Sequence, residues 1–408
     1  MEAKVPRARV LCLGSDTDAA DELGWFGVTA DDCGLFRGRS VRLDNIPSPE
    51  AGAIREVYAA SGAFAVAASA PDGGASLLVH ASDVRHRQAL AEAERIGDAA
   101  RETANAIRAA LDGFDHGPTL PDPHELPDAR LAALFDVIGK RTLIMGILNV
   151  TPDSFSDGGQ FLDRGAAAAR ALEMAAEGAD IIDVGGESTR PGADPVSAGE
   201  EIRRVIPVIR EIAEAVDAVV SIDTRKARVA EAALEAGASI VNDISGASFD
   251  PEMPALIAER RCPAVLMHIK GAPRDMQVNP SYDDLMGEVY SFLSGRIAEL
   301  RSAGADERML LVDPGIGFGK TVEHNLRLMR RLAELKSLGR PIVVGTSRKS
   351  TIGKVLGDLP AGERLEGTAA TVAVCIVNGA SVVRVHDVKQ MARVARMTDA
   401  IVRGRLEV

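Results

Sequence analysis

Short apolar runs alternate with helix-like stretches over the last two thirds of the chain. The runs are rich in Val, Ile and Leu, and they lie at 142–148, 180–184, 219–222, 239–241, 263–267, 309–312, 341–344 and 381–385. Stretches with a helical period lie between them, for example at 198–214, 227–236, 282–303 and 322–335. Apolar, β-branched strands that alternate with helices predict a parallel sheet covered by helices.

The length of this region and its eight apolar runs favour one barrel. The segment 131–408 is close in length to the roughly 250 residues typical of a (β/α)₈ barrel. The alternative is a doubly wound open sheet, which usually carries a glycine-rich dinucleotide turn after its first strand. Here that turn has the sequence NVTPDSFSDGG, so we predict a (β/α)₈ TIM barrel over 131–408.

The first part of the chain predicts a smaller α/β domain over 1–112. Apolar runs at 5–13 and 64–68 predict strands, and 86–111 predicts a long helix. The segment 113–130 contains the proline-rich sequence GFDHGPTLPDPHELP without an apolar period, which is typical of a linker. No phosphate loop, metal cluster or nucleophile motif occurs in 1–112. A packing or oligomerisation module and a regulatory or second-substrate role both remain open for it.

Composition excludes several classes of protein. The formal net charge of −12, from 47 basic and 59 acidic residues, argues against a nucleic-acid-binding surface. The four cysteines (Cys12, Cys33, Cys262 and Cys375) are scattered, which favours reduced thiols over disulfides or structural zinc. The short apolar run near the N-terminus fits neither a signal peptide nor a membrane-spanning helix. We therefore expect a cytoplasmic enzyme with no membrane partner.

Polar side chains stand at the ends of five predicted strands. They are Asn149, Asp183, Asp223, Asn242 and Asp313. In a barrel these positions converge on one face, where catalytic groups lie. Asp223 could instead be a helix N-cap and Asp313 could shape a turn. Several of these residues precede the next helix by a whole loop, however, which argues against five caps.

Basic residues follow other strands: Arg190, Arg348, Lys349, Arg384 and His386. Each could also be an ordinary solvated cation. Carboxylates and amides suit a flat heterocycle with several N–H donors, whereas the basic residues suit a phosphate. We therefore predict one acidic wall and one cationic wall, and a substrate with a donor-rich ring and an anionic tail.

Two nucleotide-binding motifs are excluded by their spacing. The sequence GFGKT at 317–321 resembles the end of a phosphate loop, but that motif requires a glycine where this chain has Pro314. Gly315, Gly317 and Gly319 likewise miss the spacing of a dinucleotide-binding turn.

The segment 143–403 resembles the dihydropteroate synthase family, the folate-pathway enzymes that sulfonamides target. The resemblance rests on ordered blocks: MGILNVTPDSFSD at 145–157, DVGGESTRPG at 183–192, SIDT at 221–224, VNDI at 241–244, MH at 267–268, DPGIGFGK at 313–320, SRK at 347–349 and RVHD at 384–387. Residues 1–112 depart from it, because they lack any pattern expected of the pterin pyrophosphokinase or aldolase sometimes fused in this pathway. Ile316 and Thr346 occupy positions at which the size of the side chain varies within the family.

The resemblance implies a role for each matched residue. Pterin would be bound by Asp183, Asp223, Asn242, Asp313 and Lys349, with Met267 packing beneath it. Diphosphate would be bound by Asn149, Arg190, Arg384 and His386, with Asn149 acting partly through Mg²⁺. 4-Aminobenzoate would be bound by Phe155, Thr189, Arg190, Pro191, Phe318, Ser347 and Lys349. The residues expected to carry catalysis are Asp223, Lys349, Arg384 and His386, and the family implies a homodimer.

The implied reaction joins 4-aminobenzoate to (7,8-dihydropterin-6-yl)methyl diphosphate and releases diphosphate. An aryl amine is neutral near pH 7, which fits the absence of a Ser/His/Asp or Cys/His arrangement. One rival is a pterin-binding barrel that transfers a methyl group to a corrinoid protein, but it has no use for diphosphate-binding cations. Another is a barrel that binds pterin and only regulates a partner.

Overall fold

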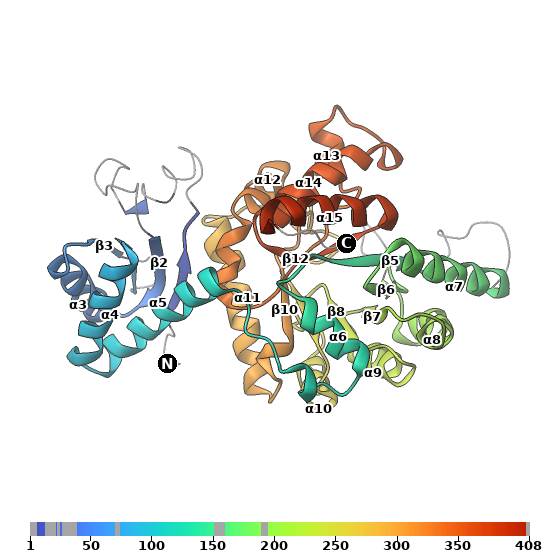
Figure 1. The fold of residues 1–408 in the computed structure, drawn as a ribbon, viewed down its shortest axis with the longest axis horizontal. Helices are drawn as coiled ribbons and strands as arrows, with labels where there is room; N and C mark the ends of the chain where they lie inside the picture. The colour runs from blue at the N-terminus through green and yellow to red at the C-terminus, as the bar shows by residue number, and fades with distance from the viewer. Residues whose placement is uncertain are drawn as a thin grey trace. The chain divides into compact units, whose positions relative to one another are not determined.

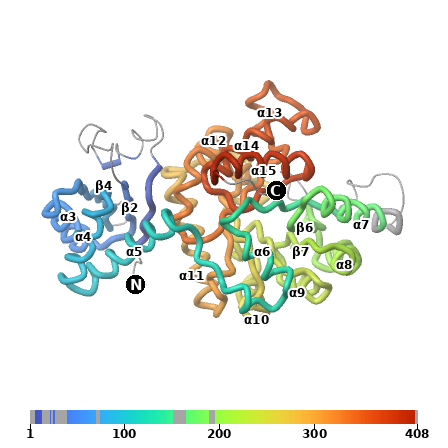
Figure 2. Tube along the Cα trace, in the orientation of Figure 1, coloured from blue at the N-terminus to red at the C-terminus, as the bar shows by residue number. Residues whose placement is uncertain are grey.

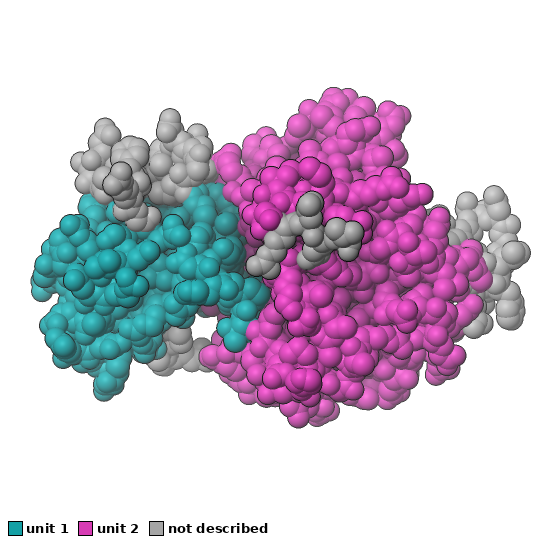
Figure 3. All heavy atoms as spheres, in the orientation of Figure 1, with its two compact units in different colours: residues 1–119, 331–340 teal, residues 120–330, 341–408 magenta. Residues whose placement is uncertain are grey.

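The computed structural model describes residues 6–12, 22, 25–26, 39–69, 74–150, 160–188 and 195–404. The chain divides into two compact units (Figure 3). The N-terminal unit comprises Met1–Thr119 together with Arg331–Arg340, and the barrel unit comprises Leu120–Arg330 and Pro341–Val408.

Eight parallel strands form a closed barrel, as the alternation of apolar runs predicted (Figure 1). The strands are β5 Leu143–Asn149, β6 Ile181–Gly185, β7 Val219–Asp223, β8 Ile240–Asp243, β9 Ala264–Met267, β10 Leu310–Asp313, β11 Ile342–Val344 and β12 Ala380–Val385. They close in the order β10-β11-β12-β5-β6-β7-β8-β9, so the open-sheet alternative is excluded. Closure places the carboxyl ends of all eight strands around one opening.

Helices surround the barrel strands, as the trace in Figure 2 shows. They are α7 Gln160–Glu177, α8 Ala198–Ala215, α9 Ala227–Glu235, α10 Met253–Arg260, α11 Leu285–Ser302, α12 Val322–Arg330, α13 Ser350–Val355, α14 Leu365–Val377 and α15 Val388–Arg403. α8 shows why they form, because Val205, Ile209 and Ile212 recur at helical spacing and are fully buried. Within the described ranges, no helix combines the length and apolar content that spanning a bilayer would require.

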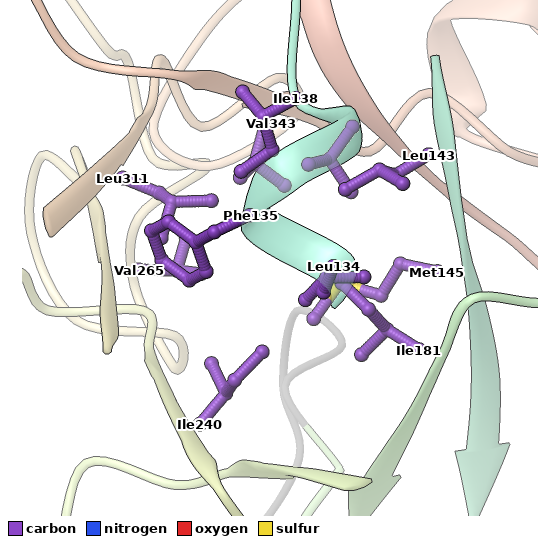
Figure 4. Close-up of a pocket in the computed structure, with 11 residues that line it drawn as sticks. Leu134, Phe135, Ile138, Leu143, Met145, Ile181, Ile240, Val265, Leu311 and Val343 are labelled. Carbon is purple, nitrogen blue, oxygen red and sulfur yellow. The ribbon is translucent and has the colours of Figure 1, made fainter. Parts of the chain in front are cut away.

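The amino ends of the barrel strands are closed by helix α6 (Ala129–Val137). The Asp128 side chain caps this helix by accepting a hydrogen bond from the backbone N–H of Arg130 at 2.8 Å. Leu134, Phe135 and Ile138 then pack against apolar strand residues (Figure 4). Only a cavity of about 10 Å³ remains between them, lined by apolar side chains. This end of the barrel therefore has no room for a substrate.

In the residues that the structure describes, the N-terminal unit contains a four-stranded antiparallel sheet and the α-helices α3, α4 and α5, which agrees with the predicted smaller α/β domain. Its elements are β1 Arg7–Val10, β2 Arg39–Ile46, α3 Ser48–Ala60, β3 Phe64–Ser69, β4 Ala75–Ala81, α4 Asp83–Ile96 and α5 Asp98–His116, with the strands in the order β1-β2-β4-β3. The sequence analysis missed β2 and β4. It also predicted one long helix at 86–111, which was wrong, because Gly97 adopts a non-helical φ of 158° between α4 and α5.

The chain around the predicted linker contains short regular elements. α5 continues to His116, and a 3₁₀ turn, η1, follows at Pro123–Glu125. Residues 117–122 between them form no helix or strand.

The segment after α12 differs from its prediction. The sequence predicted one helix over 322–335, but α12 ends at Arg330 and a 3₁₀ helix, η4, follows at Leu332–Leu338. The segment Arg331–Arg340 belongs to the N-terminal unit, where Leu332 and Leu335 are fully buried. The N-terminal unit is therefore assembled from two separate stretches of the chain.

A buried cluster of arginines and glutamates joins these two stretches. Glu22 accepts hydrogen bonds from Arg331 at 2.6 Å, Arg42 at 2.9 Å and Arg9 at 3.2 Å. Glu334 accepts from Arg331 at 2.6 Å and from Arg9 at 2.8 Å. All five side chains are at most 5% exposed. Such charges are stable in the interior only while each keeps its partners.

We predict that Glu334→Gln destabilises the N-terminal unit by about 3 kcal/mol, because it leaves Arg9 and Arg331 buried with too little negative charge. Trp25 is the only tryptophan in the chain and lies 5.2 Å from the guanidinium of Arg42. Its fluorescence during urea unfolding therefore reports this unit. Glu92→Gln is the matched control, because the pair of Glu92 with Arg95 is exposed. Its loss should not measurably change the urea midpoint of unfolding. An unchanged midpoint for Glu334→Gln would contradict the prediction.

Candidate active site

The polar residues predicted at strand ends stand together at the open end of the barrel. Asp223 and Asp313 end β7 and β10, Asn242 and Arg384 are the second-last residues of β8 and β12, and Asp183 is the third of the five residues of β6. In the strand register, Asp223 is opposite Asn242, and Asp313 is opposite Met267. The sequence prediction that these positions converge is confirmed by the closed barrel.

Arg384 connects two of the carboxylates. Its Nε donates to Oδ2 of Asp183 at 2.6 Å, and its Nη2 donates to Oδ2 of Asp223 at 2.6 Å. The sequence analysis predicted one acidic wall and one cationic wall, and in the structure Arg384, one of the predicted cations, contacts two of the predicted acids directly. Buried carboxylates carry a large desolvation cost, and a cation within hydrogen-bond distance offsets it.

Asp183 is the least exposed of the three carboxylates. It is fully buried, and its Oδ2 accepts hydrogen bonds from Arg384 and from Nδ2 of Asn242, the latter at 3.0 Å. Its Oδ1 is buried with no hydrogen-bond partner among the residues that the structure describes. A buried carboxylate oxygen without a partner is rare in proteins, and it could accept a donor from a ligand.

Three groups in the site have pKa values that are shifted toward neutral pH. Burial raises the pKa of Asp313 to about 6, although the backbone N–H of Gly315 at 2.7 Å and the nearby Lys349 and Arg384 oppose this rise. Burial lowers the pKa of Lys349 to about 8, and Arg384 adds to this effect while Asp313 and Asp223 oppose it. Burial also raises the pKa of Asp223, with Arg384 acting against the rise. Shifts of this kind are typical of functional sites.

His386 is neutral around pH 7. Burial, with the neighbouring Arg384 and Arg348, lowers its pKa to about 4. The sequence analysis grouped His386 with the cations that could bind a phosphate. In its neutral form the imidazole can serve an anion only as a hydrogen-bond donor. Its Nδ1 lies 3.0 Å from Oγ of Ser347, and its backbone N–H donates to the same oxygen at 3.2 Å.

Arg348 and Lys349 are neighbours in sequence but have different surroundings. The Arg348 guanidinium pairs with the carboxylate of Asp387, with Nε to Oδ2 at 3.0 Å. Arg348 also adopts a positive φ of 56°, a left-handed conformation that is costly for a residue with a side chain. The Lys349 ammonium lies 4.1 Å from the ring centre of Phe318. Of these two cations, Lys349 is therefore the one beside the carboxylates and the aromatic ring.

An apolar surface adjoins the carboxylates. Ile244, Met267, Met276 and Phe318 form one buried cluster at the ends of β8, β9 and β10. An apolar floor beside a few convergent polar groups is the usual composition of a site for a flat organic ligand.

The described residues offer few ligands to a metal ion. Among them, no group of three or more His, Cys, Asp or Glu residues is placed to hold one. Asn149 is half-buried at the end of β5. Its side-chain oxygen Oδ1 and the Asp223 oxygen Oδ2 both lie close to Gly185, because a Cβ placed on that glycine would be 3.7 Å from the first and 3.6 Å from the second. These two oxygens are hard ligands of the type that Mg²⁺ prefers, but substrate or water oxygens would have to complete its shell.

Four predicted site residues lie outside the described residues: Phe155, Thr189, Arg190 and Pro191. Conversely, the sequence analysis assigned no role to Lys320, whose ammonium is buried behind Phe318. The sequence GFGK was the available signal; it was considered as a phosphate loop and as part of the block DPGIGFGK, and neither interpretation gave Lys320 a role.

Comparison with known proteins identifies relatives of the barrel. The family described as pterin binding enzyme matches residues 145–386. The dihydropteroate synthase of Synechocystis is 51% identical over 268 residues, which are 66% of this chain and 92% of that protein. The N-terminal unit lies largely outside the range that the family matches.

Solved structures show the same likeness. The dihydropteroate synthase of Clostridium difficile, determined in the presence of pteroic acid, has 49% sequence identity and a TM-score of 0.62, and the match covers 65% of this chain and 98% of that one. The Xanthomonas albilineans enzyme with 4-aminobenzoic acid has 44% identity and a TM-score of 0.61, with coverage of 64% and 93%.

Proposed function

The chain belongs to the pterin-binding enzyme family, and we propose that its barrel unit works as a dihydropteroate synthase. It is a transferase of folate biosynthesis that condenses (7,8-dihydropterin-6-yl)methyl diphosphate with 4-aminobenzoate, giving 7,8-dihydropteroate and diphosphate. The observation that carries this proposal is the contact of Arg384 with Asp183 and Asp223 at the open end of the barrel. This contact places the Arg384 guanidinium, which can bind an anion, next to two carboxylates, which can accept N–H donors.

We assign the pterin ring to the carboxylates and the amide. Asp223, Asn242 and Asp313 would accept and donate hydrogen bonds along its edge, with Lys349 beside them. Asp183, whose Oδ1 has no partner among the described residues, either accepts one further N–H or orients Asn242 and Arg384. Met267 and its apolar neighbours would pack against the face of the ring.

Diphosphate departure is assigned to Asn149, Arg190, Arg384 and His386. The amine nitrogen of 4-aminobenzoate forms a bond to the methylene carbon, the C–O bond breaks, and both of its electrons leave with diphosphate. The proton that the amine loses passes to solvent or to diphosphate. Arg384 stabilises the departing charge, and neutral His386 donates a hydrogen bond. When Mg²⁺ is bound at Asn149 it supplies further positive charge to the diphosphate.

The 4-aminobenzoate site is assigned to Phe318, Ser347 and Lys349, together with Phe155, Thr189, Arg190 and Pro191. Phe318 offers an aromatic face, and the Lys349 ammonium above it offers a charge that suits the benzoate carboxylate. The Ser347 hydroxyl, held against His386, can add a hydrogen bond.

The rival reactions make different predictions. A methyl transferase acting on a corrinoid protein would release no diphosphate, and a purely regulatory pterin-binding barrel would form no product. Release of diphosphate on mixing the chain with both substrates separates the synthase from both alternatives.

We propose that Asp223→Ala and Arg384→Ala each lower turnover at least about a hundredfold, because each removes a charge that acts in the transition state. Diphosphate release measures the turnover, and circular dichroism checks that the fold is retained. Glu92→Gln, an exposed change in the N-terminal unit, should leave turnover unchanged. Near-normal turnover in either active-site variant would refute these roles.

The pH profile of kcat/KM should be bell-shaped. Asp223 and Asp313 must both be ionised to accept N–H donors, so the rate should fall as pH drops through about 7 and about 6, their respective pKa values in the site. Lys349 must be protonated to attract the benzoate, so the rate should fall as pH rises above about 8, its own pKa. Measurement from about pH 5 to about pH 9.5 tests both limbs. Lys349→Arg should abolish the continuing fall above about pH 8, and a fall above about pH 8 that is as steep as in the wild type would contradict the assignment.

We also propose that the protein is a homodimer, as the family resemblance implied. Helices α14 and α15 contact each other and expose Val374 (47%), Val377 (59%), Met397 (63%) and Ile401 (70%) to solvent. An apolar area of this kind suits a protein interface. Sedimentation should give twice the chain mass for the wild type, and Ile401→Glu should shift the protein toward monomer. A monomeric wild type would refute the proposal.

A further inference from the structure

The loop after β10, residues 314–320, lies directly on the chain that follows β9. Gly315 and Gly319 adopt positive φ values of 68° and 63°. A Cβ on Gly315 would lie 1.9 Å from the carbonyl oxygen of His268, and one on Gly319 would lie 2.2 Å from that of Lys270. Both positions therefore require glycine, because the two backbones touch there.

Side chains hold the consecutive carbonyl groups of this loop. Gln277 Nε2 donates to Gly317 O at 2.7 Å, Lys320 Nζ donates to Phe318 O at 2.9 Å, and the Tyr282 hydroxyl donates to Gly319 O at 2.8 Å. Of the three donors, Lys320 is the only cation and is 3% exposed. Burying a lysine is costly, so its hydrogen bonds must offset a large desolvation penalty.

Lys320 uses its donors on neutral acceptors. Besides Phe318 O, its Nζ lies 2.9 Å from Nδ1 of His268 and 3.4 Å from the carbonyl oxygen of His268. Burial lowers the pKa of His268 to about 2, so its Nδ1 is free to accept. Within the described ranges no carboxylate forms an ion pair with Lys320. With His268 in the tautomer that carries its proton on Nε2, the three N–H bonds of the ammonium meet three acceptors.

The hydrogen bond to Phe318 O ties Lys320 to the substrate site. The Phe318 ring packs in the apolar cluster with Met267, and the Lys349 ammonium lies over it at 4.1 Å. We propose that Lys320 is a positioning residue for 4-aminobenzoate: its ammonium, bound to His268 and to Phe318 O, fixes the Phe318 ring against which the substrate packs. This inference rests on the proposed function of the barrel.

Because Lys320 is titratable, its hydrogen bonds to His268 and to Phe318 O depend on pH. Burial lowers its pKa to about 7, Asp313 opposes that change, and Lys349 and Lys270 add to it. His268 and His324 also face this region, and Lys320 contributes to lowering the pKa of each. As pH rises through about 7, a neutral amine with only two N–H bonds replaces the ammonium, and His268 Nδ1 either loses its donor or must change tautomer and become the donor itself.

Lys320→Met tests the proposal, with Lys140→Met as the control. Lys140 is an exposed lysine whose ammonium pairs with Asp136 at 2.9 Å, and among the described residues it makes no hydrogen bond or ion pair with this loop. In Lys320→Met, KM for 4-aminobenzoate should rise at least about tenfold, while kcat and the affinity for a pterin analogue change less than about threefold. Lys320→Gln retains N–H donors without charge and should fall between this variant and wild type. The control should leave all three quantities unchanged.

Hydrogen exchange in the ligand-free protein provides a readout that does not depend on activity. The peptide covering 315–320 should exchange faster in Lys320→Met than in wild type, with β5 to β8 unchanged. Unchanged exchange with wild-type KM would overturn the proposal. Equal losses in kcat, both substrate affinities and barrel-wide protection would also overturn it, since they indicate a general structural role. If the wild-type chain releases no diphosphate, the proposed function fails, and exchange of the loop still decides whether Lys320 holds it.

Discussion

Carboxylates buried at the carboxyl ends of parallel strands need a cation within reach, and Arg384 supplies it. Asp183 is fully buried and Asp223 is nearly so, and at 2.6 Å from each the guanidinium offsets their desolvation and mutual repulsion. This interaction joins β12 to β6 and β7 across the opening of the barrel. A ligand with N–H donors and an anionic leaving group can bind to both sides of this ion pair. Its N–H donors would bind the carboxylates, and its leaving group would bind Arg384. The arrangement is thus complementary to a charge-separated transition state.

The rest of the fold confines the polar groups to the carboxyl ends of the barrel strands. Helix α6 fills the opposite end with Leu134, Phe135 and Ile138, leaving the carboxyl ends of the strands as the open side. Behind the carboxylates, the loop of Gly315 and Gly319 lies so close to the chain after β9 that backbone contact fixes its path. The N-terminal unit recruits Arg331–Arg340 from within the barrel sequence and holds it through buried arginine and glutamate pairs.

The sequence predicted the barrel well because its signals are local. Each strand is a short apolar run, and Asn242 or Asp313 at its end stands out against that run. It predicted less where contacts span hundreds of residues, as in the pair of Arg9 with Glu334. β2 was missed because polar residues such as Arg42 and Asp44 interrupt its apolar positions, while Val41 and Leu43 pack the core. The direct contact between Arg384 and the carboxylates could not be predicted either, because motif spacing does not say which charged groups pair.

The most direct test of the account is a crystal structure of this chain with 7,8-dihydropteroate bound. We expect the pterin ring against Asp223, Asn242 and Asp313, the benzoate end beside Phe318 and Lys349, and Arg384 at the point where the two parts join. A ligand bound away from the carboxyl ends of the strands would contradict the account, as would a pterin ring that makes no hydrogen bond to either Asp223 or Asp313.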